Sequence, residues 1–142
     1  MNKNNHHWFK KIKSNISGYG LCSNRYIPCG TILLEYMGKR ITTAEAESPT
    51  YKNNRYLLSL DFDKIIDGSK KNNIARFINH SCHPNCEAIT SNKKVYIMNI
   101  KPIKKGEELT YDYNLESYQW ITHCRCPSCQ VIVNNPPYNK LS

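Results

Sequence analysis

Residues 73–85 read NIARFINHSCHPN, and this is the most informative stretch of the chain. Its first half, IARFIN, is apolar enough for one or two helical turns. The polar residues Asn79, His80 and Ser81 follow, and then a turn at Pro84. A backbone folded over at Asn79 and His80 can offer carbonyl groups and a side-chain amide to a small polar ligand. On local evidence alone, a helix C-cap at Asn79 followed by a proline turn is the favoured explanation.

The rest of the chain consists of short apolar or alternating runs separated by turns. A short helix is expected to begin near Thr42 and Thr43 and to stop before Pro49. Many short strands with little helix predict a mainly β domain rich in non-local contacts. The predicted strands cover residues 31–37, 56–62, 64–67, 94–100 and 109–113.

The bulk properties fit one intracellular domain. The 142 residues and the hydrophobic share of 39% are enough for a single core. No apolar run approaches the roughly 18 residues that a membrane span needs, so no membrane partner is expected. Residues 1–15 are polar and rich in Asn, Lys and His, and we expect a flexible basic arm there. Because this arm lacks the apolar stretch of a secretory signal peptide, a nuclear or cytoplasmic location is expected.

The formal net charge is +9, and lysines occur in pairs along the chain. Such a surface attracts polyanions, so contact with DNA or with a nucleosome is one expectation. The alternative is that the charge only keeps the protein soluble.

Three of the seven cysteines fall within six residues, as Cys124, Cys126 and Cys129. An odd count with a tight cluster argues against a disulfide framework and favours reduced thiolates that bind a metal. Zinc takes four tetrahedral ligands, so the C-x-C-x-x-C cluster needs one more ligand from elsewhere. Three free thiols are the alternative.

Several motifs, in this order along the chain, resemble those of SET-domain protein lysine methyltransferases. They are Gly18-Tyr19-Gly20, Tyr36-x-Gly38, residues 73–85, EELTYDY at 107–113, and the cysteine cluster, which resembles a post-SET zinc knuckle. The resemblance implies a SET fold of small curved β-sheets with short helices and a C-terminal pseudoknot. It also implies the divisions of the chain: a SET domain over 16–121, a post-SET zinc-binding segment over 122–130, and a polar tail over 131–142.

The resemblance implies S-adenosylmethionine as cofactor. The Asn-His pair of the family helps to hold the methionine part and the adenine, and this role falls here on Asn79 and His80. For Gly18 and Gly20 taken alone, an ordinary turn is the better explanation. The residues expected at the cofactor are Gly18, Tyr19, Gly20, Tyr56, Arg76, Asn79, His80 and Tyr113.

Tyr113, Tyr111 and Tyr36 are the expected catalytic residues, also by resemblance. A free lysine has a pKa of about 10.4, whereas the nucleophile is the neutral amine. A narrow apolar channel and the sulfonium charge both lower that pKa. Tyrosines line such a channel and orient the amine through their hydroxyls and ring faces. Tyr111 occupies the position at which the family carries Phe or Tyr, and a Tyr there favours mono- or dimethylation. The alternative is that LTYDY is merely a core strand.

The resemblance assigns Cys82 as the fourth ligand of one structural zinc, with Cys124, Cys126 and Cys129. The family cluster usually has four residues between its second and third cysteines, whereas this chain has only Pro127 and Ser128. The shorter spacing leaves Cys86 and His123 open as substitute ligands.

The family's usual substrate is a protein lysine, often in a histone tail laid down as an added strand. A histone tail is therefore the expected partner, and a non-histone protein is the alternative. A catalytically inactive, zinc-stabilised module that binds nucleic acid is a second function class. A homodimer is open for an enzyme of this size, and so is delivery to a host nucleus from a virus or an intracellular bacterium.

Overall fold

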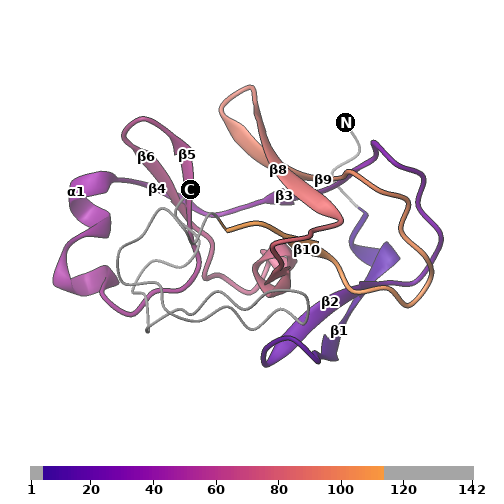
Figure 1. Ribbon diagram of the computed structural model, residues 1–142. Helices are drawn as coiled ribbons and strands as arrows, with labels where there is room; N and C mark the ends of the chain where they lie inside the picture. The colour runs from indigo at the N-terminus through magenta and orange to yellow at the C-terminus, as the bar shows by residue number, and fades with distance from the viewer. Residues whose placement is uncertain (1–4, 114–142) are drawn as a thin grey trace.

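The computed structural model describes residues 5–113 as four small sheets joined by short helical turns (Figure 1). The sheets have the strand orders β1-β2, β10-β7, β3-β9-β8 and β4-β6-β5. The strands are β1 (Phe9–Lys13), β2 (Tyr19–Ser23), β3 (Ile32–Tyr36), β4 (Lys39–Thr42), β5 (Leu57–Asp61), β6 (Lys64–Asp67), β7 (Asn79–His80), β8 (Cys86–Ser91), β9 (Lys94–Asn99) and β10 (Thr110–Tyr111). The helix α1 (Thr43–Ala46) and the 3-10 turns η1 (Asn5–Trp8), η2 (Pro49–Tyr51) and η3 (Ile74–Phe77) complete the fold. The prediction of a mainly β fold with short helices is confirmed.

The local signals explain several of these elements. Helix α1 begins where predicted, because the Thr42 hydroxyl accepts a hydrogen bond from the Glu45 amide at 3.1 Å as an N-cap. The hairpin β8-β9 closes through Asn92 and Lys93, whose φ values of 51° and 62° match the turn that fits twisted strands. Strand β9 is central in its sheet, and its residues are mostly buried.

The main core lies between the sheets. Leu33, Leu34, Ile78 and Ile97 are almost completely buried in it, and the three tyrosines of the predicted catalytic group belong to the same cluster. A smaller cluster packs beneath α1 and consists of Ile41, Ala46, Leu57 and Ile65. Strand β3 ends at Tyr36, so the packing of this strand on β9 places that phenol inside the molecule.

The expectation of a flexible arm over residues 1–15 is wrong for the part that the structure describes. Residues 9–13 form β1, which pairs antiparallel with β2 from Phe9↔Ser23 to Lys13↔Tyr19. Phe9 is 6% exposed and joins the main core. The strand is stable because β2 supplies both its hydrogen bonds and its apolar contacts, and neither is visible in the local sequence.

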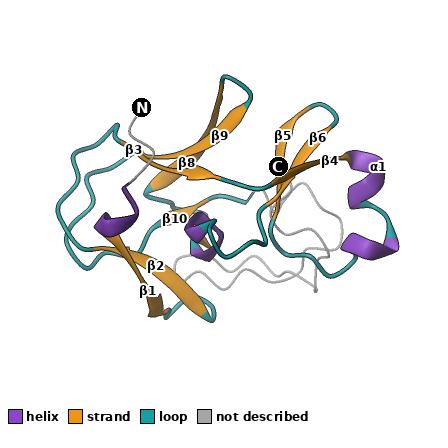
Figure 2. Ribbon diagram, turned by 180° about the vertical axis from the view of Figure 1, so that it is seen from behind, coloured by secondary structure: helices purple, strands orange, loops and turns teal. Residues whose placement is uncertain are grey.

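Two segments far apart in the chain meet at the centre of the molecule. Strand β10 pairs parallel with β7, with Thr110 beside Asn79 and Tyr111 beside His80. In both views β10 lies close to η3 (Figures 1 and 2). The pairing brings residues 73–85 and 107–113, two of the motifs that resemble the SET family, side by side. The expected pseudoknot involves the chain after residue 113, which lies outside the described residues.

Within residues 5–113, none of the helices is long or apolar enough to cross a membrane.

Candidate active site

Asn79 connects the Gly18-Tyr19-Gly20 turn to the centre of the molecule. Its side-chain amide nitrogen lies 3.1 Å from the Ser17 carbonyl oxygen and 2.9 Å from the Tyr19 carbonyl oxygen. Gly18, between these two residues, has a φ of +49°, which favours glycine. The structure therefore brings Asn79 together with the backbone on both sides of Gly18.

A carboxylate that the sequence analysis did not single out completes this contact. The Asn79 amide lies 2.9 Å from Glu108 Oε1, and the Ser14 hydroxyl donates to the same oxygen at 2.8 Å. A Cβ on Gly20 would collide with the Glu108 carboxylate, so the glycine is what lets this side chain approach. Ser14 and Glu108 are separated by 94 residues, and no local sequence signal could have paired them.

His80 is held by the backbone that follows β10. The Tyr113 amide donates to His80 Nδ1 at 3.1 Å, so Nδ1 carries a lone pair. The other ring nitrogen, Nε2, lies 3.2 Å from Cys82 Sγ. The His80 and Tyr113 rings are tilted, with centroids 5.3 Å apart.

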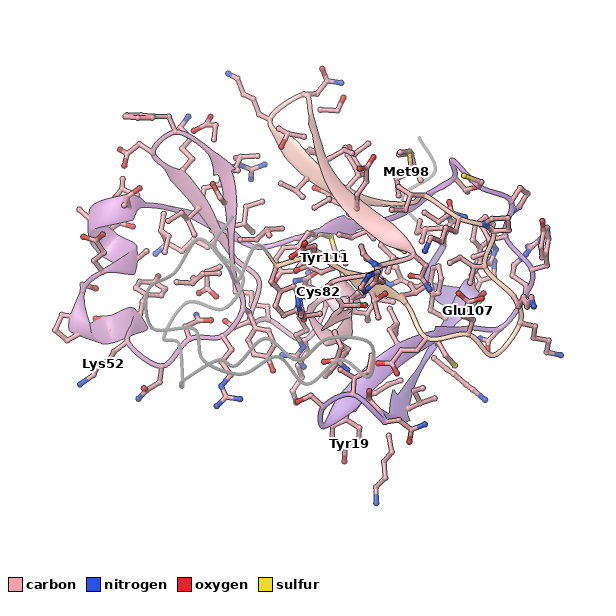
Figure 3. The ribbon with its side chains drawn as sticks, viewed as in Figure 1. Tyr19, Lys52, Cys82, Met98, Glu107 and Tyr111 are labelled. Carbon is pink, nitrogen blue, oxygen red and sulfur yellow. The ribbon has the colours of Figure 1, made fainter. Side chains whose placement is uncertain are left out.

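The three predicted catalytic tyrosines form one buried cluster. The Tyr111 and Tyr113 ring centroids are 4.8 Å apart. The Tyr36 hydroxyl donates to the Tyr56 carbonyl at 2.8 Å, and the Tyr113 hydroxyl donates to the Ile78 carbonyl. Figure 3 shows Tyr111 near the centre of the molecule, where its side chain is almost completely buried.

Burial decides the protonation state of these phenols. Loss of solvent raises the pKa of Tyr36, Tyr111 and Tyr113 well above the ordinary value of 10.0. For Tyr36 and Tyr113 the neighbouring phenols add to the effect of burial. All three are therefore neutral at physiological pH, and they act as hydrogen-bonding groups and not as bases.

Two further residues hold the Tyr36 ring and were missed by the sequence analysis. A Cβ on Gly68 would collide with this ring and with the Asn73 amide. Asn73 is fully buried; its amide donates to the Gly68 carbonyl at 2.9 Å, and its carbonyl accepts from the Met37 amide at 3.1 Å. The Asp67-Gly68 turn was visible in the sequence, but its contact with Tyr36 was not.

Arg76 and Tyr56 also lie together, as expected for residues on the same side of a ligand. The Arg76 guanidinium carbon is 5.6 Å from the Tyr56 ring centroid, and Nη1 donates to the Ser69 carbonyl at 2.6 Å. The Arg76 Nε is buried and has no hydrogen-bond partner among residues 5–113. A buried donor of this kind fits a ligand that brings an acceptor.

Of the predicted zinc ligands, only Cys82 falls within the described residues, where it is partly buried. Cys124, Cys126 and Cys129 lie outside them, as does His123. Cys86 is fully buried, and its thiol lies 3.3 Å from the Asn85 side-chain oxygen. Burial raises the pKa of Cys86 to about 12, which opposes the thiolate form that a zinc ligand needs. No group of three or more potential metal-binding side chains occurs between residues 5 and 113.

Comparison with known proteins agrees with the arrangement of these motifs. Histone-lysine N-methyltransferase set-2 of Caenorhabditis elegans is 38% identical over 127 residues, which are 82% of this chain and 8% of that protein. The human histone-lysine N-methyltransferase, H3 lysine-36 specific, is 35% identical over 136 residues, 87% of this chain and 5% of that protein. The H3 lysine-4 specific enzyme of Chaetomium globosum is 38% identical over 120 residues, 75% of this chain and 11% of that protein.

The chain thus spans between 5% and 11% of the length of these three relatives. The family model described as SET domain matches residues 18–114, which include both glycines of the turn, Asn79, His80 and all three tyrosines of the cluster. This match covers most of the chain, and the chain belongs to the SET domain family.

Proposed function

We propose that this chain is a protein lysine N-methyltransferase that uses S-adenosylmethionine. One observation carries the proposal: the β7-β10 pairing joins Asn79 and its glycine turn to the buried tyrosine cluster. A site for a polar cofactor and a site for an uncharged amine are thereby adjacent. The relatives, each named a histone-lysine N-methyltransferase, support the same reaction.

The residues present fit the cofactor. The buried Nε of Arg76 lacks an acceptor among the described residues, and the Gly18 turn presents backbone beside Asn79. Arg76, Asn79, His80 and this turn would hold the cofactor. When bound, S-adenosylmethionine supplies an electrophilic methyl group on a sulfonium.

The tyrosines would prepare the amine. The Tyr113 hydroxyl donates to the Ile78 carbonyl, and a phenol oxygen is also an acceptor, so this group would accept an amine N–H. Because the phenols are buried and neutral, their surroundings disfavour the ammonium form and lower the lysine pKa. Orientation of the neutral amine by these groups can supply roughly 7–11 kcal/mol of barrier reduction in favourable cases.

We propose a histone tail as the substrate. The names of two relatives with similar identity give different target lysines, lysine-36 and lysine-4 of H3, so sequence identity does not select one of them. The net charge of +9 supports docking on nucleosomal DNA, from which the tail would be reached. This substrate implies nuclear action, whereas a cytoplasmic location would favour a non-histone protein. A homodimer is a further proposal, and analytical ultracentrifugation of the chain would measure its mass in solution.

Transfer of a labelled methyl group tests the function directly. The full chain is incubated with labelled S-adenosylmethionine and, separately, with nucleosomes, free histones and a cell lysate. We expect label on histone lysine. Label only on other lysate proteins would move the substrate to the non-histone alternative. Cofactor binding without any transfer, together with DNA binding, would support the inactive nucleic-acid-binding module instead.

We also propose a structural zinc bound by Cys82, Cys124, Cys126 and Cys129. The fully buried, proton-retaining thiol of Cys86 supports Cys82 over Cys86 as the ligand. Metal analysis of the purified chain is expected to give one zinc per chain, and Cys82→Ser to lower it. Retention of zinc in Cys82→Ser, with loss in His123→Ala, would favour the substitute ligand.

Replacing Tyr111 with Phe is expected to shift the products toward higher methylation. The hydroxyl of this buried phenol restricts space and hydrogen bonding beside Tyr113, and its loss makes room for a methylated amine. One group in a tight pocket is worth roughly 1–3 kcal/mol, so the ratio of tri- to monomethyl product should rise about tenfold. Mass spectrometry of the product peptide measures the ratio, and an unchanged ratio contradicts the role.

Replacing Glu108 with Gln is expected to lower the affinity of the chain for S-adenosylhomocysteine about tenfold. The neutral side chain loses a charge-assisted hydrogen bond to Asn79, which is worth roughly 1.5–3 kcal/mol in proteins. Calorimetric titration with S-adenosylhomocysteine measures the affinity. The matched control is Glu107→Gln, because the Glu107 carboxylate bonds instead to the Asn85 amide at 2.8 Å. Equal losses in both variants would contradict a specific role for Glu108.

A further inference from the structure

Five side chains form a row of alternating aromatic and cationic groups along one side of the site. The Lys11 ammonium lies 4.2 Å from the Tyr19 ring centroid and 4.8 Å from the Phe77 ring centroid. The Arg76 guanidinium carbon lies 4.6 Å from the same Phe77 centroid and 5.6 Å from that of Tyr56. The row runs from Tyr19 in the glycine turn to Tyr56, whose backbone carbonyl accepts a hydrogen bond from the Tyr36 hydroxyl. Three of its members, Tyr19, Arg76 and Tyr56, are residues expected at the cofactor, whereas Lys11 and Phe77 were not predicted.

The register of the N-terminal hairpin fixes Lys11 in this row. Lys11 is opposite Leu21, and Lys13 is opposite Tyr19. Residues directly opposite share a face of the ladder, so Lys11 and Tyr19 are diagonal neighbours on one face. Tyr19 is 52% exposed and projects from the edge of the molecule in Figure 3. The Lys11 stem is thus directed by backbone pairing, and its ammonium remains accessible to a ligand.

The two cations of the row are not neutralised by carboxylates within residues 5–113. The only approach of a basic group to a carboxylate within 4.0 Å there is that of His80 to Asp112. Lys11 and Arg76 nevertheless share the Phe77 ring, although like charges repel. Arg76 adds a buried Nε with no partner in the same part of the chain. Two gathered cations with an unused donor fit an anionic group of a ligand.

We propose that Lys11 is a further cofactor-binding residue, whose ammonium recognises the carboxylate of the methyl donor and of its demethylated product. The inference rests on the proposed function, because it names which part of that cofactor lies at the Tyr19–Phe77 end of the row. Arg76, on the same Phe77 ring, adds positive charge to this end of the row. The contact binds and orients, and it takes no part in the transfer of the methyl group.

The test compares two ligands, of which only one carries the aminocarboxypropyl group with its carboxylate. S-Adenosylhomocysteine carries the aminocarboxypropyl group, and methylthioadenosine lacks it. The full chain is titrated calorimetrically with each ligand as wild type, Lys11→Met and Lys11→Arg. Methionine keeps an apolar stem between the rings but removes the charge. Lys10→Met is the matched control, since Lys10 is the adjacent exposed residue and pairs with Cys22.

Lys11→Met is expected to bind S-adenosylhomocysteine about fivefold more weakly, the upper range for an exposed charge pair. Its affinity for methylthioadenosine should equal that of the wild type, and Lys11→Arg and Lys10→Met should behave like the wild type with both ligands. The difference should shrink at high salt. Equal weakening of both ligands would overturn the proposal, as would no change in either. Failure of the wild type to bind S-adenosylhomocysteine would instead remove the proposed function.

Discussion

The Tyr113→Phe variant is expected to transfer methyl groups about 10²-fold more slowly than the wild type, the usual loss when a reacting group is misplaced by about 1 Å. The Ile78 carbonyl fixes the hydroxyl by accepting its hydrogen bond, and the phenol oxygen is the acceptor proposed to orient the amine. Without it, the amine keeps its apolar surroundings but loses its acceptor. The effect should appear in kcat, and the affinity for S-adenosylhomocysteine should change little.

Two controls separate this effect from a loss of structure. The variant leaves the Ile78 carbonyl without its phenol donor, which can cost about 1–3 kcal/mol of stability, so Tm must be measured alongside. Tyr96→Phe removes another phenol that is 4% exposed, on β9, and should retain activity. A Tyr113→Phe enzyme that is folded and equally active would contradict the assignment of Tyr113 to the amine.

The strands that sequence reasoning identified are those with a strong local signal. Residues 31–37 contain β3, residues 56–67 contain the hairpin β5-β6, and residues 94–100 contain β9. Strand β8 was missed because only Cys86 of its sequence CEAITS is buried; the strand forms through its ladder with β9. The predicted helical turns over 74–79 end at Phe77, since Asn79 pairs with Thr110 instead of capping a helix. The pairing of Asn79 with Thr110 joins segments far apart in the chain, and it leaves no periodicity in either segment.

In the candidate site, too, only some of the residues could be predicted from the sequence. The ordered motifs placed Asn79 beside the Gly18 turn and the tyrosines beside each other, because the resemblance carries long-range information that periodicity lacks. Glu108 and Asn73 were not found, since each acts through a contact that spans the fold. Their signal in the sequence is only a polar residue beside a strand or turn, and such residues are common on surfaces.

Alkaline pH is expected to unfold this protein steeply. Burial raises the pKa of Tyr36, Tyr111 and Tyr113 above 10.0 and that of Cys86 from 9.0 to about 12. Below about pH 8 these groups are protonated in both states and contribute no pH dependence. As pH rises further, the unfolded chain releases these protons first, so the free energy of unfolding falls by about 1.4 kcal/mol per group and pH unit.

Cys86 alone should therefore set the slope of the free energy of unfolding between about pH 9 and 10. Above pH 10 the four groups together should lower this free energy by about 5 kcal/mol per pH unit. Because domains are stable by only about 5–15 kcal/mol, unfolding is expected near pH 11–12. Denaturant titrations at successive pH values measure the free energy, and tyrosinate absorbance should rise together with the loss of circular dichroism. Cys86→Ala should flatten the first part of the curve, and Tyr26→Phe, at a phenol that is 58% exposed, should leave it unchanged. Gradual appearance of all the tyrosinate signal in the folded protein would contradict the burial of the cluster. The same desolvation that raises the pKa of these phenols is expected to lower the pKa of the substrate lysine. Loss of the burial would therefore also remove the physical basis for a neutral lysine amine beside neutral phenols.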